Sequence, residues 1–334
     1  MLRDRVVRMM PFRRARASTN ANTETARSLK PRKVRMTQHH FDRITLVSVT
    51  GLADAQGAAY ALALSLRQMP GARALLCCPH PPSDLPPGIR HCRIAPLNYH
   101  EYSWFMMFAL WRLIETDYVL TVQSDGWVLD ASNWTDSFFE YDYIGAPTHI
   151  ARIQSEGGAQ WVQGYSWYER LGQPGQVITP VLNGGFSLRS RKMLRALIDH
   201  RHIKVELNPP DDLIGEPLRM QWVGAGPNED VQLTVVLREQ LQAAGLRFAP
   251  LDLAMQFSIE HSGPLHRVDT LARLFGHHGQ HRRLVSIDPP VVRYPVAQDR
   301  FEGTTEMAVA EHLQRIGYRV EFVQPQAAPA AAVA

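Results

Sequence analysis

The sequence predicts an α/β fold, in which a sheet of buried strands is flanked by helices. From residue 44 onward, short β-branched apolar runs alternate with segments of helical periodicity. The 334 residues are 45% hydrophobic, which suffices for one large domain or two small ones. One apolar run, residues 118–122, stops just before an acidic residue, Asp125, as strands do at the ligand-binding edge of such sheets. We expect the folded body to span residues 38–322.

The first half of this body begins with a βα unit. Residues 44–50 predict a strand, and Gly51 leads into an Ala- and Leu-rich helix over residues 56–68. Residues 73–78 predict a second strand, and the Pro-rich residues 79–87 predict a loop. Ser103 is the expected N-cap of a helix that delivers the chain to the strand before Asp125. This layout is of a nucleotide-binding type, although the chain has neither a GxGxxG fingerprint nor a P-loop.

Residues 150–179 are rich in Gly, Gln, Trp and Tyr and show no clear periodicity. They predict an irregular insertion beside a site. Their aromatic side chains, Trp161, Tyr165, Trp167 and Tyr168, are either exposed on a binding loop or fold over the sheet as ordinary cover. The sequence leaves both interpretations open.

Regular structure returns at residues 181–190, which predict a strand that contains the adjacent glycines Gly184 and Gly185. Two glycines in a strand imply a close approach by a ligand or by another backbone. A basic helix over residues 191–200 follows, and a closing helix is expected over residues 306–317.

The positive charge of the chain lies almost entirely in its first segment. The net charge is +4, but 11 of the 36 Lys and Arg and only 2 of the 32 Asp and Glu fall in residues 1–35, which leaves 25 basic and 30 acidic residues elsewhere. This distribution argues against a nucleic-acid-binding surface on the body. Residues 1–37 are expected to be a basic disordered arm, an organelle-targeting leader, or the result of a start upstream of Met36. The Ala/Pro-rich residues 323–334 are expected to be a disordered tail.

The cysteines and the hydropathy pattern restrict the compartment. Cys77, Cys78 and Cys92 have no CxxC spacing and predict neither a disulfide framework nor a thiolate zinc site. The first two continue a strand pattern and are expected to be small buried hydrophobic residues. Because no uninterrupted apolar run reaches about 18 residues, we expect no transmembrane segment. Cytoplasm is the simplest location.

Asp125 is the first candidate functional residue. A carboxylate at the end of a sheet strand is well placed to hold a metal ion or a ribose. The alternative is that Ser124-Asp125-Gly126 is only a polar turn between two strands, because Asp-Gly is a favoured hairpin pair and the apolar pattern resumes at Trp127.

Two further groups of ionisable residues stand out. Glu229 and Asp230 follow Asn228, a good N-cap, and fall in the first turn of an expected buried helix, where the helix dipole alone favours acids. His277 and His278 lie in an expected glycine-flanked loop. A histidine near a carboxylate is an ordinary ligand of a divalent ion, although the chain has 14 histidines and a chance pair is unsurprising.

Taken in order, these segments resemble one family. The motifs are QSDGW at residues 123–127, NGGFSLRS at 183–190, PNEDV at 227–231 and FGHHG at 275–279. Together they are similar to the DUF5672 family over roughly residues 44–279. That family looks like glycosyltransferases of the GT-A fold. The resemblance implies a Rossmann-like mixed sheet flanked by helices, in a single domain, and a glycosyltransferase that uses nucleotide sugars.

The resemblance also implies a divalent cation, Mn²⁺ or Mg²⁺, held by an Asp-x-Asp tripeptide and often by a C-terminal histidine. Here the tripeptide is Gln123-Ser124-Asp125, so only its last carboxylate remains. Asp125 and His278 are the expected ligands, and diphosphate oxygens and water would complete an oxygen-rich shell. The expected donor is a UDP-sugar.

The acid pair matches the position at which inverting GT-A enzymes carry a catalytic base. Asp230 is the expected base, which takes the proton from an acceptor hydroxyl, and Glu229 is its neighbour or a ligand of the acceptor. Arg189 and Arg191 are either phosphate-neutralising groups or solvated arginines near the start of a helix.

The remaining expected contacts are with the donor. The backbone of Val49, Thr50 and Gly51 is expected to contact the base or the ribose, and Ser124 is expected to belong to the same donor-binding residues. The donor and acceptor are expected to lie over a floor that is formed by Asn183, Gly184 and Gly185.

Three hypotheses follow. The first is an inverting, metal-assisted glycosyltransferase that acts on a glycan or small hydroxyl acceptor. The second is a non-catalytic nucleotide-sugar binding protein, which the missing acid of Asp-x-Asp motivates. The third is a nucleotidyltransferase or another Rossmann-like enzyme, which would share the acid at the strand end and would release pyrophosphate.

Overall fold

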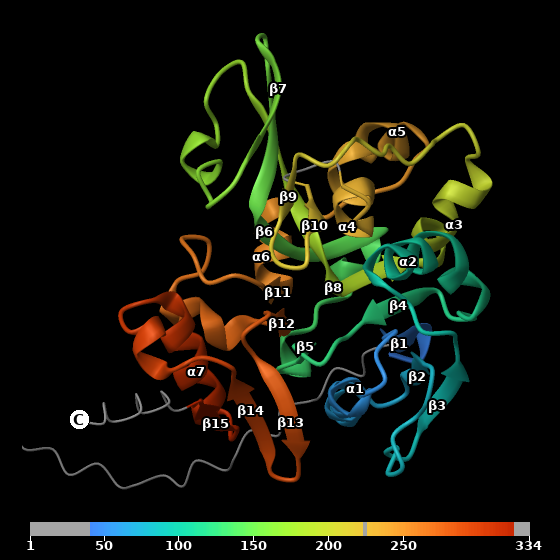
Figure 1. Ribbon diagram of the computed structural model, residues 1–334, viewed down its shortest axis with the longest axis vertical. Helices are drawn as coiled ribbons and strands as arrows, with labels where there is room; N and C mark the ends of the chain where they lie inside the picture. The colour runs from blue at the N-terminus through green and yellow to red at the C-terminus, as the bar shows by residue number, and fades with distance from the viewer. Residues whose placement is uncertain (1–40, 223–225, 324–334) are drawn as a thin grey trace, which may run out of the picture. The chain divides into compact units, whose positions relative to one another are not determined.

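The computed structural model describes residues 41–222 and 226–323, and its centre is a seven-stranded mixed sheet of order β3-β2-β1-β4-β8-β6-β7 (Figure 1). The strands are β1 (Ile44–Val49), β2 (Arg73–Cys78), β3 (Ile89–Arg93), β4 (Tyr118–Thr121), β6 (Tyr143–Ser155), β7 (Gly158–Val162) and β8 (Val177–Ser190). The first four are parallel to one another, and β8, β6 and β7 continue the sheet in antiparallel pairs. The predicted fold class, a mixed α/β sheet flanked by helices in a single domain, is confirmed.

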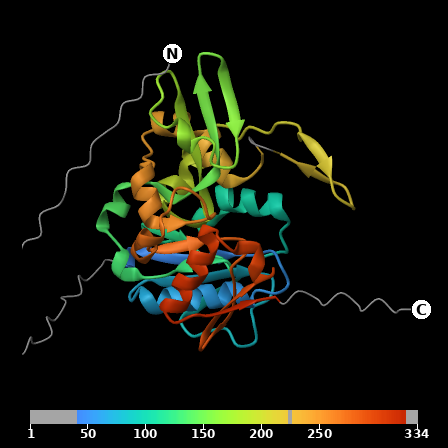
Figure 2. The same cartoon turned by 90° about the vertical axis from the view of Figure 1, so that its left-hand side faces the viewer.

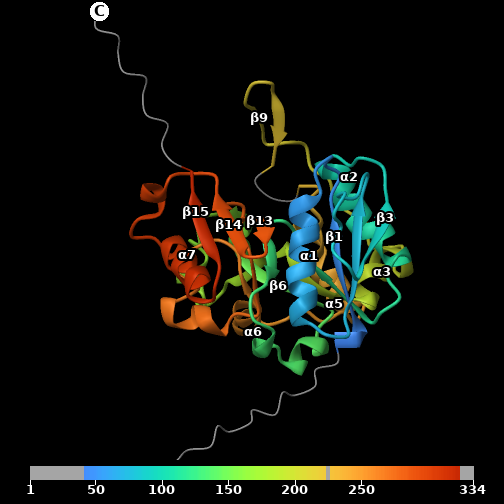
Figure 3. The same ribbon diagram turned by 90° about the horizontal axis from the view of Figure 1, so that it is seen from below.

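Strand β1 is buried on both faces, which explains its continuous apolar run. Ile44 and Leu46 pack in the same core cluster as helix α1 (Gln56–Gln68), whereas Val47 and Val49 pack on the opposite face in the cluster that contains Met106. Helix α1 in turn lies between the main sheet and strand β13 (Arg283–Ile287) (Figure 3). The predicted bounds of α1 and β2 agree with the structure.

The helix before β4 begins earlier than the sequence pattern suggested. Helix α2 (Tyr99–Trp104) is capped by Asn98, whose side chain accepts hydrogen bonds from the backbone N–H groups of His100 and Glu101, while the Glu101 carboxylate accepts from the Asn98 N–H. Ser103 is therefore a buried residue inside the helix and not its cap. A capping box was present in the sequence at residues 98–101, and it outcompetes the later serine. The chain continues as a π-helical turn, η2 (Phe105–Ala109), and a 3-10 turn, η3 (Leu110–Arg112).

Residues 150–179 are more regular than expected. Strands β6 and β7 pair as a hairpin from Ala151↔Val162 to Ser155↔Gly158, and only the part between β7 and β8 is irregular (Figure 2). The hairpin closes at Gly158, whose positive φ of 105° favours glycine. Of the aromatic side chains, Tyr165 and Trp167 are buried in a satellite core with Leu265, so they act as cover rather than as an exposed binding surface.

The other elements surround the sheet (Figure 1). The remaining helices are α3 (Arg191–Asp199), α4 (Glu229–Val231), the π turn η7 (Gln232–Val236), α5 (Arg238–Ala243), α6 (Leu251–Phe257) and α7 (Thr305–Arg315). The 3-10 turns are η1 (Phe41–Arg43), η4 (Ala131–Asn133), η5 (Asp136–Glu140), η6 (Tyr168–Arg170), η8 (Val268–Arg273) and η9 (Gln298–Phe301). The remaining strands of the described ranges form three small sheets. The first contains β10 (Arg219–Gln221) and β9 (Asp212–Ile214), and the second contains β11 (Ser258–Ile259), β12 (Gly276–His278) and β5 (Gly126–Val128). The third contains β13, β14 (Pro290–Tyr294) and β15 (Arg319–Phe322).

The histidine motif is thus part of a strand, not a loop. His277 and His278 belong to β12, which pairs with β5 immediately after Asp125. This pairing is invisible to local pattern analysis, because the two strands are far apart in the sequence.

The termini and cysteines complete the description. Cys77 and Cys78 are buried and Cys92 is partly exposed, and all three are free. The expected basic arm, with Met36, lies outside the described residues, as does the expected tail from residue 324. No helix in the described ranges combines the length and the apolar character needed to cross a bilayer.

Candidate active site

The site begins where the strand order reverses. Strands β1, β2 and β3 succeed one another on one side, whereas β4 lies on the other side of β1. The carboxyl ends of β1 and β4 therefore flank a topological switch point, the place where open α/β sheets bind ligands. The chain leaves β4 through a tight turn, in which Gln123 and Gly126 exchange two backbone hydrogen bonds of 2.9 Å. Asp125 is thus both a turn residue and a residue of the ligand-binding edge.

Asp125 is buried, with 7% of its surface exposed, and is held by two cations. The Arg283 Nη1 group donates to Oδ2 at 2.6 Å, and the His278 Nε2 atom lies 3.4 Å from Oδ1. Burial alone would raise the pKa of Asp125, but the charges of His278 and Arg283 outweigh it and hold the pKa well below its usual range. The carboxylate is therefore ionised across the physiological pH range.

His278 is surrounded by oxygen atoms. Its Nε2 atom donates to the Gln123 side-chain carbonyl at 3.1 Å, and its Nδ1 atom lies 3.7 Å from the Glu260 carboxylate. Gln123 is itself oriented by donation from its amide to the Tyr102 hydroxyl at 2.9 Å. Burial lowers the pKa of His278, but the charges of Asp125 and Glu260 outweigh this effect and raise the pKa to about 10.

In this structure these groups are paired with one another, and they could hold a divalent cation only after His278 lost the proton that its raised pKa favours. The His278 Nε2 atom lies close to both Asp125 Oδ1 and Gln123 Oε1, and oxygen with imidazole donors suits Mg²⁺ or Mn²⁺. Glu260 stands behind the other ring nitrogen, as carboxylates that orient metal-binding histidines do. Within the described ranges no three His, Cys, Asp or Glu side chains form a metal-binding group. Asp125 and His278 as ligands of a divalent cation therefore stay a prediction.

The two glycines of β8, Gly184 and Gly185, lie between the surroundings of Asp125 and a second acid, Glu229. Leu182 and Ser187 of β8 pair with Pro147 and Gly145 of β6. Four residues, 183–186, lie between the two pairs on β8 but only one on β6, so residues 183–186 form a bulge. The Asn183 side chain closes the bulge by accepting from the Phe186 N–H at 2.9 Å.

Each glycine of the bulge lies against a different pair of side chains, Gly184 against Glu229 and Arg189 and Gly185 against His278 and Gln123. A Cβ on Gly184 would lie 2.3 Å from Glu229 Oε1, and a Cβ on Gly185 would lie 2.3 Å from His278 Nε2. The close approach predicted for these glycines is therefore made by protein side chains. Gly185 contacts the half of the site that contains Asp125 and His278, and Gly184 contacts the half that contains Glu229 and Asp230.

Glu229 and Arg189 form a buried ion pair. The Arg189 Nη2 group donates to Glu229 Oε1 at 3.0 Å and to the Gly184 carbonyl at 3.1 Å, and Arg189 has no exposed surface. The interpretation of Arg189 as a solvated arginine is wrong, because the residue lies inside β8 with its guanidinium over the Tyr143 ring. Arg191 is partly buried and donates to the Ile114 carbonyl, which fixes it structurally.

Asp230 differs from its neighbour in having no ion-pair partner in the part of the chain that the structure describes. It is half-buried, and among the described residues its Oδ1 accepts only from the adjacent Val231 N–H at 2.8 Å. Burial, followed by the charges of Glu229 and Glu260, raises the pKa of Asp230 above its usual range. Asn228 occupies the N-cap position without a side-chain cap bond.

The residues expected to contact the donor lie at the same edge but are largely engaged. Val49 is a core residue, and the Thr50 N–H donates to the Cys77 carbonyl at 2.9 Å. A Cβ on Gly51 would lie 2.1 Å from the Leu97 carbonyl, so this glycine permits close packing of two backbones. The Ser124 carbonyl accepts from the Leu284 N–H at 3.0 Å.

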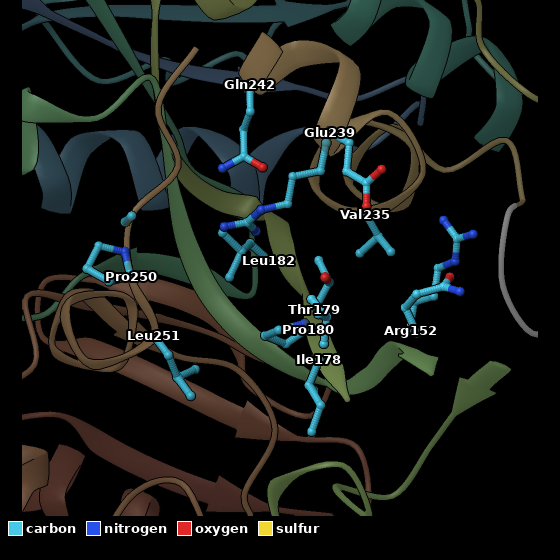
Figure 4. A pocket seen from close by; sticks show the side chains of 14 residues that line it. Arg152, Ile178, Thr179, Pro180, Leu182, Val235, Glu239, Gln242, Pro250 and Leu251 are labelled. Carbon is cyan, nitrogen blue, oxygen red and sulfur yellow. The ribbon is translucent and has the colours of Figure 1, made fainter. Parts of the chain in front are cut away.

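Several residues of the site escaped the sequence patterns. Gln123, Glu260 and Arg283 contact Asp125 or His278, and His261 lies 3.5 Å from Glu260. Only Gln123 carried a signal, as the residue in place of the first acid of Asp-x-Asp. A separate cavity of about 330 Å³ lies between β8 and α5, and none of the candidate site residues lines it (Figure 4).

Comparison with known proteins supports part of the resemblance. A model of the family described as "Protein of unknown function (DUF5672)" matches residues 96–278, which include Asp125, Glu229, Asp230 and His278. Comparison with curated proteins gives no match. Among solved structures, the galactosyltransferase LgtC in complex with donor and acceptor sugar analogues aligns at 13% identity, with a TM-score of 0.36, over 82% of this chain and 99% of its own. An active-site mutant of LgtC aligns at 12% identity with a TM-score of 0.33, over 71% and 87%.

Proposed function

The chain belongs to the DUF5672 family, and we propose that it is a glycosyltransferase that moves a sugar from a nucleotide-sugar donor to a hydroxyl acceptor. The observation that carries the proposal is the junction at the β8 bulge. Gly185 packs against His278, the partner of Asp125, and Gly184 packs against Glu229, the neighbour of Asp230. The proposed donor site, through His278, and the proposed base, through its neighbour Glu229, therefore approach adjacent glycines of β8.

The donor half is suited to a leaving diphosphate. Asp125, His278 and Gln123 supply the oxygen and nitrogen donors described above, and the half-exposed Arg283 adds a guanidinium. A divalent cation bound there would neutralise the charge that develops on the departing diphosphate. Arg283 would contact the same oxygens directly. The carboxyl ends of β1 and β4, with Thr50, Gly51 and Ser124, would lie along the nucleotide, and a UDP-sugar is the first donor to test.

The acceptor half is suited to proton removal. In an inverting displacement the acceptor oxygen forms a bond to the anomeric carbon as the bond to the diphosphate oxygen breaks, and the hydroxyl proton passes to a base. Asp230 is assigned this role, because its carboxylate forms no ion pair with the residues that the structure describes and its raised pKa makes it a stronger base. Glu229 is assigned a positioning role, since Arg189 already holds its carboxylate.

The test is a donor panel with Mn²⁺ or Mg²⁺, scored by released nucleoside diphosphate. Asp230→Asn is expected to lower kcat by about 10²–10⁴-fold, the usual contribution of a general base, without loss of fold. Asp252→Asn, at an exposed position of α6, is the matched control and should retain activity.

Three results would contradict the proposal. Tight binding of UDP or GDP without turnover of any donor would indicate a binding protein. Release of pyrophosphate from a nucleoside triphosphate would indicate a nucleotidyltransferase. Full activity in Asp230→Asn would remove Asp230 as the base.

A further inference from the structure

A cavity of about 300 Å³ adjoins the site on the side of Glu260. We name it the Glu260 cavity, and its lining includes Glu260, His261, Gly279, His281, Arg300 and Phe301. Two of these residues also touch the site: the Gly279 N–H donates to the Asp125 carbonyl at 2.8 Å, and Glu260 lies beside His278. The cavity therefore shares a wall with the donor half. Its volume falls at the lower end of the range for small-molecule sites.

Two lining residues, Arg282 and Glu306, are held in a hydrogen-bond network. Arg282, which is 1% exposed, donates to Glu306 at 2.8 Å and to the Glu260 carbonyl at 2.7 Å. Tyr294 donates to the same Glu306 carboxylate at 2.9 Å. The charges of Arg282 and Glu306 are thus satisfied by each other, and these two residues are structural.

Glu260 has unused hydrogen-bonding capacity. The residue is 8% exposed, and its Oε1 atom lies 3.5 Å from His261 Nδ1 and 3.7 Å from His278 Nδ1. Its Oε2 atom is buried and has no hydrogen-bond partner among the described residues. Because a buried carboxylate oxygen without a partner is unfavourable, a donor group from a ligand would relieve the cost.

Another part of the lining combines aromatic rings and a cation. The rings of His281 and Phe301 are 5.3 Å apart, and Phe301 is anchored by Tyr294 at 5.5 Å. Arg300, next to Phe301, is exposed and forms no ion pair within the described ranges. These groups suit a ring that has hydroxyl groups on its edge and C–H groups on its face. The hydroxyl groups can donate to a carboxylate and accept from a guanidinium, and the C–H face can pack on an aromatic ring.

We propose that the Glu260 cavity binds a saccharide ring of the transferase substrates, with hydroxyl groups donating to Glu260 and accepting from Arg300, and with the ring face against Phe301. The inference rests on the proposed function for its choice of substrate. Both the donor sugar and the acceptor supply this chemistry, and the experiment distinguishes them.

The experiment measures binding in the full-length protein. Free glucose, galactose, mannose and N-acetylglucosamine are titrated by ligand-observed NMR, and UDP and UDP-sugars are titrated by calorimetry. The variants are Arg300→Ala and Phe301→Leu, and Asp299→Ala is the matched control, because Asp299 shares the turn η9 but does not line the cavity. The variants are expected to bind the saccharide about tenfold more weakly, as the loss of one good contact predicts, with UDP affinity unchanged.

The pattern of losses identifies the source of the ring. Weaker binding of a UDP-sugar, with UDP unaffected, assigns the cavity to the donor sugar. Weaker binding of a free saccharide, with the UDP-sugar unaffected, assigns it to the acceptor. Saccharide binding that the variants weaken, without turnover of any donor, would retain the cavity and reject the transferase. Wild-type affinities in both variants, or no saccharide binding to the wild type, would overturn the cavity assignment.

Discussion

The two acidic halves of the site hold their carboxylates in opposite ways. Asp125 is clamped between Arg283 and His278, which keeps its pKa low and its charge fixed. Asp230 has no such clamp, and burial beside Glu229 and Glu260 raises its pKa. A carboxylate with a fixed charge suits the holding of cations, whereas one with a raised pKa suits proton transfer. The contrast teaches that the partners of an acid, more than its place in a motif, indicate its chemistry.

The largest expected effect comes from removing the ion pair that supports the Asp230 half. Arg189→Met would leave the Glu229 carboxylate buried without a partner, so the free energy of unfolding should fall by about 3–5 kcal/mol. Denaturant unfolding measures the change. Arg195→Met, which breaks a surface pair with Asp199 at a partly exposed position, is the control and should leave stability nearly unchanged. Equal decreases in the free energy of unfolding in the two variants would show that the buried pair contributes no more to stability than the surface pair.

The Asp125 half should respond in binding. Asp125→Asn removes the charge that faces His278 and Arg283, and the affinity for UDP with Mn²⁺ should fall on the order of 10–100-fold. Calorimetry with and without Mn²⁺ separates the contribution of the cation. Asp252→Asn serves again as control. Unchanged affinity in both conditions would place the diphosphate elsewhere.

The bulge allows the two halves to be perturbed separately. Gly184→Ala and Gly185→Ala should each lower the free energy of unfolding by about 1–3 kcal/mol, because each new methyl group meets a side chain of the site. The first should act mainly on kcat and the second mainly on UDP affinity. Gly157→Ala, which meets only Ser155 at 3.8 Å, is the control. Identical functional effects of the two variants would mean that the halves are not distinct.

The smallest expected effect is a displacement of the pH profile. Asp230 must be ionised to act as a base, so activity should fall with decreasing pH at values above the usual carboxyl range. Because the Glu229 charge contributes to the raised pKa, Glu229→Gln should move this acidic limb to lower pH. A raised pKa in the folded state also destabilises the fold above the pKa of the unfolded state. Asp230→Asn should therefore be more stable than the wild type at neutral pH and lose this advantage in acid.

Local patterns in the sequence predicted the local structure well. Helix α1 and strand β2 have the expected bounds, because an amphipathic helix and an apolar strand are each encoded by neighbouring residues. Asp125 was identified for the same reason, as the acid that follows such a strand. The start of α2 differs from the predicted one for another reason, because the capping box at Asn98 is itself a local signal and begins the helix before Ser103.

The partners of the site residues could not be predicted, because they depend on long-range pairing. Arg283 meets Asp125 across 158 positions of the sequence, and Arg189 meets Glu229 across 40. Glu260 follows β11, a strand of two residues that is defined by its pairing with β12 and has no pattern of its own in the sequence. The resemblance to a family supplied the acids and His278, but the structure shows which of these acids is clamped and which is not.

The bulge in β8 also bears on how this chain can change over evolution. Because Gly184 and Gly185 each abut a different half of the site, the number of residues between Leu182 and Ser187 fixes the spacing of the two halves. Adding or deleting one residue there would turn the following side chains to the other face of the sheet. We therefore expect the length of this segment to tolerate change less well than the side chains around it.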